Sequence, residues 1–268
     1  MDLMIEGKVA IVTGASTGIG EAVAYELAGN GVRVVITARG EKRLKETAKR
    51  IGAETGSEVA AVAADVTEAD AAERLVAAAV KRFGGIDIVV NNAGRAQAGG
   101  LLETTDADWS RMEEVKIHAM VRLNRAAIPH MRRKHWGRIV NMSSIGGIYP
   151  NPKLLISHVL SAAINNLTKS LALEVAKDGI LVNAIAIGAI RTDNWASNMI
   201  PKVRQTRPDL AALDDEALIE LLGAELTPVG RFGIPEEIAA VAAFLVSARN
   251  GFVTGCTVEA SGGADRFM

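Results

Sequence analysis

The fold of this protein is decided by the stretch Val9-Ala10-Ile11-Val12-Thr13-Gly14-Ala15-Ser16-Thr17-Gly18-Ile19-Gly20, where an apolar, β-branched run passes directly into a glycine-rich turn. A helix pattern follows at once. Gly14 permits the tight reversal, Gly18 lets backbone N–H groups approach a pyrophosphate, and Gly20 lets helix and strand pack closely. A strand before the glycines and a helix after them are typical of a phosphate-binding turn. The predicted nucleotide contacts here are Gly14, Ser16, Thr17, Gly18, Ile19 and Gly20.

Working outward, short apolar runs alternate with longer helical patterns along the chain, which indicates a parallel sheet. The runs are continuously apolar, as expected for strands covered by helices on both faces. We predict strands at 9–13, 32–37, 59–64, 86–91, 138–142, 181–187 and 257–259. Right-handed crossovers then give an α/β, doubly wound fold of about seven parallel strands. No break in composition suggests a linker, so we expect one domain over residues 1–268.

Composition narrows the class of partner. The chain has 30 basic and 31 acidic residues and a net charge of -1, which gives no broad attraction for nucleic acid or an anionic membrane. A small-molecule substrate is the better expectation. One cysteine, Cys256, excludes an intrachain disulfide, and no apolar stretch reaches membrane-spanning length. A cytoplasmic location is therefore expected. The basic run 130–135 is placed at the end of a helix, where cations complement the helix dipole.

Two segments suggest features beyond the nucleotide site. The predicted helix over residues 154–176 is apolar nearly all round, which favours packing on another subunit in a homodimer or homotetramer. Residues 192–226 interrupt the strand–helix rhythm before the last helix, where a doubly wound fold can place a substrate lid. This segment carries Trp195, Met199 and Ile200, which hint at a partly apolar substrate.

The glycine spacing Gly-x-x-x-Gly-x-Gly resembles that of the short-chain dehydrogenase/reductase family, which has a Rossmann fold. Further matches cover almost the whole chain: Asp65-Val66, Asn91-Asn92-Ala93-Gly94, Gly137-Arg138-Ile139-Val140-Asn141-Met142-Ser143-Ser144, Val182-Asn183-Ala184-Ile185 and Arg231-Phe232-Gly233. The resemblance implies a dinucleotide cofactor. It places Asp65, Val66, Asn92, Ala93 and Gly94 near the adenosine, and Ile190 and Thr192 facing the nicotinamide.

Cofactor choice is expected to depend on Arg39. NAD enzymes usually place a carboxylate at the end of the second strand, where this chain reads Thr37-Ala38-Arg39. A guanidinium there pairs with a 2′-phosphate and stacks on adenine, so NADP(H) is favoured and NAD(H) is the alternative. Many NADP-preferring relatives have a second basic residue at the position of Thr17, and this chain lacks it.

The resemblance fails at the reaction centre. The family uses a Ser, a Tyr, a Lys one helical turn later and an Asn from the preceding helix; these positions fall on Ser144, Ser157, Ser161 and Lys116. Three of the four are therefore replaced. A literal Tyr-x-x-x-Lys occurs at Tyr149 and Lys153, but Pro150 and Pro152 are incompatible with the helix that such a pair requires. We expect Tyr149 to line the substrate pocket, with a replacement acid as the alternative.

Lys116 is the substitution with the clearest chemical meaning. Pointing inward, it returns an ammonium to the space of the missing Lys, and burial lowers its pKa toward reactivity; pointing outward, it is structural. Ser144 and Ser157 form a two-hydroxyl clamp for an oxyanion if another group supplies the proton. His118 and His158 are offset from these positions on their helices, and no metal-ligand spacing is present.

Three functions follow from this pattern. The first is an NADP(H)-dependent oxidoreductase for a carbonyl or alcohol with a non-standard acid/base set, which we favour because the cofactor site is nearly complete. The second is a non-redox enzyme, a lyase or hydrolase, on the same scaffold. The third is a catalytically silent NADP(H)-binding subunit. The missing Tyr and Lys favour the last two.

Overall fold

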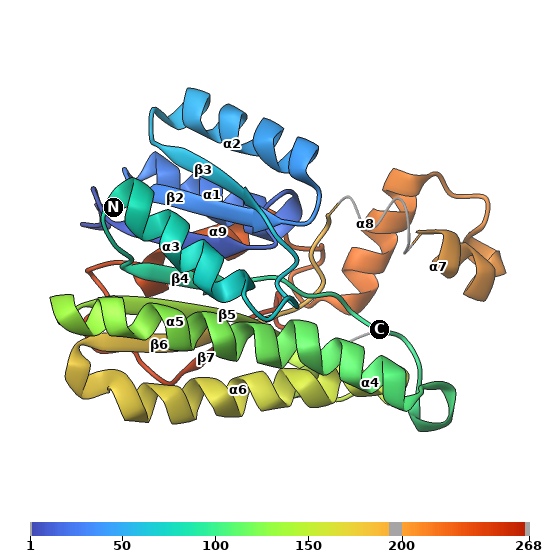
Figure 1. Ribbon diagram of the computed structural model, residues 1–268. Helices are drawn as coiled ribbons and strands as arrows, with labels where there is room; N and C mark the ends of the chain where they lie inside the picture. The colour runs from blue at the N-terminus through green and yellow to red at the C-terminus, as the bar shows by residue number, and fades with distance from the viewer. Residues whose placement is uncertain (1, 193–199, 266–268) are drawn as a thin grey trace.

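The computed structural model describes residues 2–192 and 200–265 (Figure 1). Seven strands form one parallel sheet in the order β3-β2-β1-β4-β5-β6-β7. Their bounds are Val9–Thr13 (β1), Arg33–Ala38 (β2), Val59–Ala63 (β3), Ile88–Asn91 (β4), Gly137–Ser144 (β5), Ile180–Ile187 (β6) and Thr257–Ala260 (β7). The predicted doubly wound Rossmann fold is confirmed.

Helices cover both faces of the sheet (Figure 1). One core contains residues of α1 (Gly18–Gly29), α2 (Glu41–Thr55) and α9 (Pro235–Val246). The other contains residues of α3 (Ala71–Phe83), α5 (Ala119–Lys134) and α6 (Leu155–Val175). The shorter α4 (Asp106–Glu113) runs into α5 through one π-helical turn at Glu114–His118. Two separate apolar cores on one sheet explain why its strands are apolar without alternation.

The strand boundaries differ from the predicted ones mainly at β5. The strand was expected to end at Met142, but its ladder with β6 continues until Ser144 pairs with Ile187. Pairing with β6 along its whole length satisfies the backbone hydrogen bonds of Ser143 and Ser144, and their side chains gave no sign of this pairing. Ser144 therefore lies at the carboxyl end of a central strand, the edge at which doubly wound sheets bind ligands.

The predicted lid segment forms a small helical unit with its own core. It contains α7 (Ile200–Thr206) and α8 (Asp215–Leu226), which Figure 1 shows projecting from the carboxyl edge of the sheet. Ile200 is 2% exposed and packs in the lid core with Val203, Leu218 and Phe232. Trp195 and Met199 lie outside the described residues. Ile200 therefore supports the lid's internal packing, and its burial removes it as evidence for an apolar substrate.

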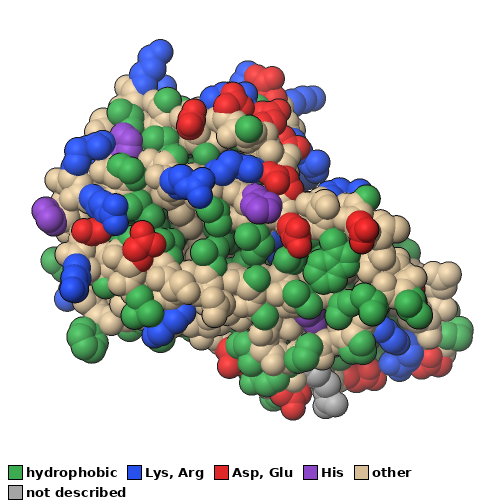
Figure 2. All heavy atoms as spheres, turned by 60° about the horizontal axis from the view of Figure 1, so that its bottom comes forward, with side chains coloured by type: hydrophobic (Ala, Val, Ile, Leu, Met, Phe, Trp, Pro, Cys, Tyr) green, Lys and Arg blue, Asp and Glu red, His purple; other side chains and the backbone are tan. Residues whose placement is uncertain are grey.

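One face of the molecule is rich in exposed apolar groups. Val159 and Leu173 on α6 are 45% and 73% exposed. Figure 2 views the molecule from the side of α5 and α6 and shows hydrophobic side chains gathered between charged ones. No helix in the described part of the chain is long and apolar enough to cross a bilayer.

The packing of α1 on the sheet gives a testable prediction. A Cβ on Gly20 would lie 2.4 Å from both Asn92 Nδ2 and the Gly14 carbonyl oxygen, whereas a Cβ on Gly29 at the other end of α1 meets nothing within 4 Å. We expect Gly20→Ala to lower the free energy of unfolding by about 1–3 kcal/mol through overpacking. Gly29→Ala, the matched control, should be neutral or stabilising by up to about 1 kcal/mol. Denaturant unfolding measures both, and equal effects would contradict the packing argument.

Candidate active site

The carboxyl ends of β1 and β4 are joined by a compact set of hydrogen bonds. The Thr13 hydroxyl accepts the backbone N–H groups of Asn92 and Ala93, each at 3.0 Å. The Asn92 side-chain amide in turn donates to the carbonyls of Thr13 and Gly14, both at 3.0 Å. The predicted phosphate turn and the predicted Asn92–Gly94 segment therefore lie side by side. Gly14, at φ +64°, comes within contact of Ala93, which explains why it lacks a side chain.

The N-terminus of α1 is open to an anion. Thr17 is the N-cap residue, yet its side chain makes no capping hydrogen bond, so the first-turn N–H groups are left for another acceptor. Gly18 has φ +61°, and a Cβ there would lie 3.6 Å from Thr192 Cγ2. Thr192 thus lies over the start of α1. These free donors, the helix dipole and the absence of side chains fit a pyrophosphate.

Ser16 and Ile19 complete the predicted turn. Both are partly buried, and the Ser16 carbonyl accepts a hydrogen bond from the Thr47 hydroxyl of α2 at 3.1 Å. Ile190 is buried and forms a β-bridge with Gly233, which fixes the segment leading to Thr192. The structure therefore brings the segments of the predicted cofactor set to one edge of the sheet.

Arg39 and Asp65 lie at the far end of this edge. Arg39 is exposed just after β2, and Asp65 follows β3, where its carboxylate accepts the N–H and hydroxyl of Thr67. These hydrogen bonds, with a smaller contribution from the Arg39 charge, lower the pKa of Asp65. The Arg39 charge thus acts on the fixed Asp65 carboxylate, and the exposed Arg39 guanidinium is accessible to a ligand.

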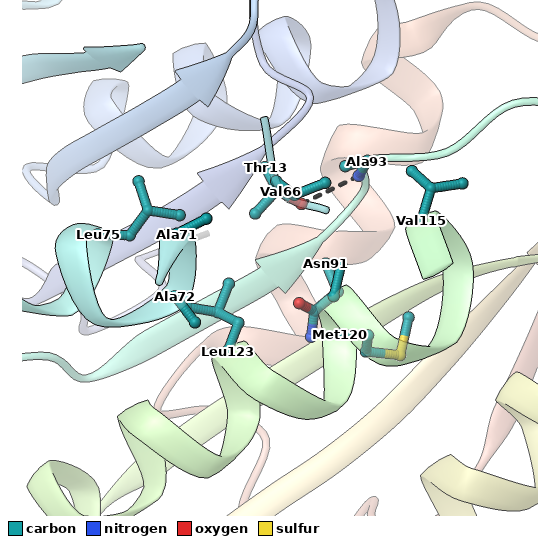
Figure 3. Close-up of a pocket in the computed structure, with 11 residues that line it drawn as sticks. Thr13, Val66, Ala71, Ala72, Leu75, Asn91, Ala93, Val115, Met120 and Leu123 are labelled. Atoms are coloured by element: carbon teal, nitrogen blue, oxygen red, sulfur yellow. Dashed lines mark hydrogen bonds between the residues drawn. The ribbon is translucent and has the colours of Figure 1, made fainter. Parts of the chain in front are cut away.

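A small pocket adjoins this region between β1, β4, α3 and α5 (Figure 3). Val66, Ala93 and Val115 lie at the side nearest the predicted adenosine contacts, while Leu75 and Leu123 line its interior. Its lining is mainly apolar, and Lys116 is not part of it. We place the reaction centre elsewhere, at Lys116, Ser157 and Ser161, because hydrogen-bonding groups gather there.

Lys116 points into the molecule from the π-helical turn between α4 and α5. Its ammonium is within hydrogen-bond distance of the Ser161 hydroxyl (3.3 Å) and the Ser157 carbonyl (3.4 Å), both on α6. A Cβ on Gly94 would lie 3.8 Å from Lys116 Cγ, so the aliphatic stem passes against the end of the Asn92–Gly94 segment. Of the two orientations that the sequence left open, the structure has the inward one. Ser157, Ser161 and Lys116 are brought together.

Burial sets the acidity of this amine. Desolvation lowers the pKa of Lys116 to about 8, and no carboxylate among the described residues pairs with it. Two neutral oxygens at long hydrogen-bond distances replace little of the lost hydration. Lys116 therefore exchanges its proton close to neutral pH, the property required of a general acid or base.

Ser144 retains a free donor. Its Oγ accepts the backbone N–H of Gly146 at 3.1 Å, as the N-cap of a short 3-10 turn, and its O–H has no acceptor among the described residues. The neighbouring Ser143 hydroxyl donates to the Ser161 carbonyl at 3.1 Å, which holds the end of β5 against α6. Ser144 can therefore donate a hydrogen bond to a substrate oxygen at the carboxyl end of β5.

Ser157 is engaged by a loop that the sequence analysis did not single out. Its Oγ accepts the backbone N–H of Gln97 at 2.7 Å and donates to the Gln97 carbonyl at 3.3 Å. The only proton of this hydroxyl is thereby used, which argues against the two-hydroxyl clamp with Ser144. Nothing in the residues around Gln97 signalled this contact, because it joins segments 60 positions apart.

The literal Tyr-x-x-x-Lys segment is not helical. Tyr149 and Lys153 precede α6, and Lys153 is exposed. A hydrogen bond from the Tyr149 hydroxyl to Glu259 raises the pKa of Tyr149, which makes this phenol a weaker proton donor. The nearby His158 is buried, and its Nδ1 accepts the Asn151 N–H at 2.8 Å. His118 is exposed. In the part of the chain that the structure describes, no group of three or more His, Cys, Asp or Glu is placed to hold a metal ion.

Comparison with known proteins places this geometry in a family. The family model described as enoyl-(acyl carrier protein) reductase matches residues 14–265. The 3-oxoacyl-[acyl-carrier-protein] reductase FabG of Vibrio cholerae is 37% identical over 259 residues, covering 97% of this chain and 98% of the relative. The 3beta-hydroxysteroid dehydrogenase 1 of Eggerthella lenta is 37% identical over 261 residues, covering 97% and 94%.

Solved structures agree with this placement. L-sorbose reductase from Gluconobacter frateurii, complexed with NADPH and L-sorbose, superposes with a TM-score of 0.92 at 35% identity over the full length of both chains. A single-residue variant of actinorhodin polyketide ketoreductase with NADPH gives 0.85 at 33% identity, covering 95% of this chain and 96% of that one. Fold, phosphate turn and sequence similarity over nearly the whole length lead to one conclusion: the chain belongs to the short-chain dehydrogenase/reductase family.

Proposed function

We propose that this protein is an NADP(H)-dependent oxidoreductase that acts on a carbonyl or alcohol substrate with a non-standard acid/base set. The observation that carries the proposal is the Lys116 ammonium, held against Ser161 and Ser157 beside the Asn92–Gly94 segment. In the family, the Tyr and Lys positions fall on Ser157 and Ser161. A titratable amine next to Ser157 and Ser161 supports the proposal that Lys116 takes over the proton-handling role of the family's Tyr and Lys.

The cofactor contacts follow from the open edge of the sheet. Gly14, Ser16, Thr17, Gly18, Ile19 and Gly20 would hold the pyrophosphate at the start of α1, and Asp65, Val66, Asn92, Ala93 and Gly94 the adenosine and adjoining ribose. Ile190 and Thr192 would face the nicotinamide. Arg39 would pair with the 2′-phosphate of NADP(H), in agreement with the NADPH in two related structures, and NAD(H) is the alternative.

The protein's own residues would manage the proton. NADPH supplies a hydride to the substrate carbonyl carbon, so the carbonyl oxygen needs a proton. Ser144 donates a hydrogen bond to that oxygen, and the Lys116 ammonium donates the proton. Ser161 orients the ammonium, while Ser157 acts as a positioning residue that holds the Gln97 backbone. A proton donor of this kind contributes roughly 10²–10⁴-fold to the rate.

The remaining assignments concern the whole molecule. We propose one dinucleotide-binding domain over residues 1–268, with 192–226 as the substrate lid. We also propose a cytoplasmic homodimer or homotetramer that uses the apolar side of α6, where Val159 and Leu173 are exposed. The substrate is a small molecule that enters between the lid and Lys116.

Cofactor preference tests Arg39. We expect Arg39→Ala to raise the Kd for NADPH roughly 10- to 100-fold, because a charge-assisted hydrogen bond to the 2′-phosphate is lost, and to leave the Kd for NADH nearly unchanged. Lys45→Ala on α2, where Lys45 is already paired with Glu41, is the control and should change neither. Calorimetric titration measures all three proteins. Tighter binding of NADH than of NADPH by the unchanged protein would show that the assignment to Arg39 is wrong.

Steady-state NADPH oxidation with carbonyl substrates tests Lys116. Lys116→Met should lower kcat by roughly 10²-fold or more, whereas Lys153→Met should leave it unchanged. Because the ammonium is the proton donor, kcat/KM for reduction should be level below about pH 8 and fall about tenfold per pH unit above it. Equal effects of the two substitutions would contradict the role of Lys116. Turnover that is indifferent to cofactor redox state would favour a lyase or hydrolase instead.

Burial of Lys116 also has a consequence for stability. In the unfolded chain Lys has a pKa near its ordinary value of 10.5, and folding lowers it to about 8, so the folded state disfavours the charged form. The resulting penalty is fully present below about pH 8, shrinks as pH rises, and vanishes above about 10.5. Lys116→Met should therefore raise the free energy of unfolding at pH 7 by roughly 3 kcal/mol at most, and by less at pH 10. Chemical denaturation at the two pH values checks this; a gain independent of pH would show that burial of the charge is not the cause.

A further inference from the structure

The loop that follows β4 is fastened to the reaction centre at three places. Gly94 packs against the Lys116 stem, and Gln97 exchanges two backbone hydrogen bonds with the Ser157 hydroxyl. Gly99 forms a β-bridge with Leu154 and donates its N–H to the Lys153 carbonyl at 2.8 Å. The short span between Gly94 and Gln97 is thus held at both ends against the residues proposed to handle the proton.

Arg95 lies in this span. Its side chain is exposed, and within residues 2–192 and 200–265 no hydrogen bond, ion pair or ring contact joins its guanidinium to another group. Several other arginines of the chain have carboxylate partners, such as Arg111 with Asp108 and Arg231 with Glu237. A guanidinium with its donors free, on a backbone already fixed in place, gives up little further backbone entropy when it binds a ligand.

Two of the three acidic side chains that follow Arg95, up to the first turn of α4, are engaged by partners other than Arg95. Asp108 accepts hydrogen bonds from Thr105, Arg111 and the Gln97 amide, and Glu103 accepts the Gly100 N–H. Asp106 is exposed in the first turn of α4. On the inner side of the loop the charge is the Lys116 ammonium, which has no described carboxylate partner. The loop therefore carries one cation, Arg95, without a carboxylate partner among the described residues, and Lys116, whose stem lies against Gly94, is a second such cation.

We propose that Arg95 is a specificity-determining residue that binds a carboxylate on the substrate, so that the preferred substrates are oxo acids. The inference rests on the proposed reductase function and names the substrate class of that same site. A guanidinium binds a carboxylate through two parallel hydrogen bonds, which fixes the orientation of the carbonyl relative to Ser144 and Lys116. A neutral ester of the same shape lacks this interaction.

Matched pairs of substrates test the assignment. We would measure NADPH oxidation with pyruvate, acetoacetate and levulinate, each beside its methyl ester, since the spacing between carbonyl and carboxylate is set by the site. In the unchanged protein, kcat/KM for at least one acid should exceed that of its ester roughly tenfold or more. Arg95→Gln should bring this ratio to about one, Arg95→Lys should retain part of it, and the control Lys153→Gln should retain all of it.

The pH dependence adds a readout that a merely structural arginine would not change. A bound carboxylate favours the charged form of Lys116, so the alkaline limb of kcat should lie at higher pH than that of kcat/KM for the acid. For the ester the two limbs should coincide. The Kd for NADPH should be the same in Arg95→Gln as in the unchanged protein.

Three results would overturn the inference. One is an acid-to-ester ratio that Arg95→Gln leaves unchanged; another is a ratio near one in every pair with the unchanged protein; the third is a marked loss of NADPH affinity in Arg95→Gln, which would make Arg95 a cofactor contact. If no compound is reduced, the reductase function fails. Calorimetric binding of the same acids and esters to the protein with NADP⁺ then decides the role of Arg95, because equal binding by Arg95→Gln would still refute it.

Discussion

The site depends on the contact between the ends of β1 and β4. Neighbouring parallel strands whose chains continue in opposite directions leave a crevice there, and the Thr13 hydroxyl closes its base by accepting two consecutive N–H groups from Asn92 and Ala93. Asn92 returns two hydrogen bonds to the glycine turn. The free N-terminus of α1 can face a phosphate only because this contact holds the turn, and Gly20 fits only because it has no side chain.

The same contact leads to the surroundings of Lys116. Ala93 leads to Gly94, Gly94 supports the stem of Lys116, and the chain then reaches Gln97, which occupies both hydrogen-bonding functions of the Ser157 hydroxyl. Short side chains at Ser157 and Ser161 leave room for a long one from the neighbouring helix. Lys116, Ser157 and Ser161 therefore form one unit, in which the lysine approaches from the π-helical turn while the serines serve as its hydrogen-bond partners and as the anchor for the loop.

The electrostatic environment of this unit determines the acidity of Lys116 and gives the site a positive charge. Lys116 is partly removed from water, and its hydrogen-bond partners among the described residues are neutral oxygens. Its charged form is therefore destabilised, and its pKa is lowered to about 8. Arg95, exposed on the loop that follows Gly94, adds a second positive charge, while the carboxylates of Asp108 and Glu103 are engaged by Thr105, Arg111 and Gly100. A site of this kind disfavours a cationic substrate and stabilises negative charge that develops on oxygen.

The sequence by itself determined the glycine turn and the parallel sheet of apolar strands, because these features depend on local spacing and residue type. It also placed Tyr149 and Lys153 outside a helix, since proline geometry is local. It left the direction of Lys116 open, because one π-helical turn rotates the side chains that follow it and no residue type announces such a turn. The contact of Gln97 with Ser157 was decided only by the tertiary structure, because it joins segments 60 positions apart in the chain. The same holds for the lack of a partner for Arg95 among the described residues, because the sequence does not say which charges come close to it.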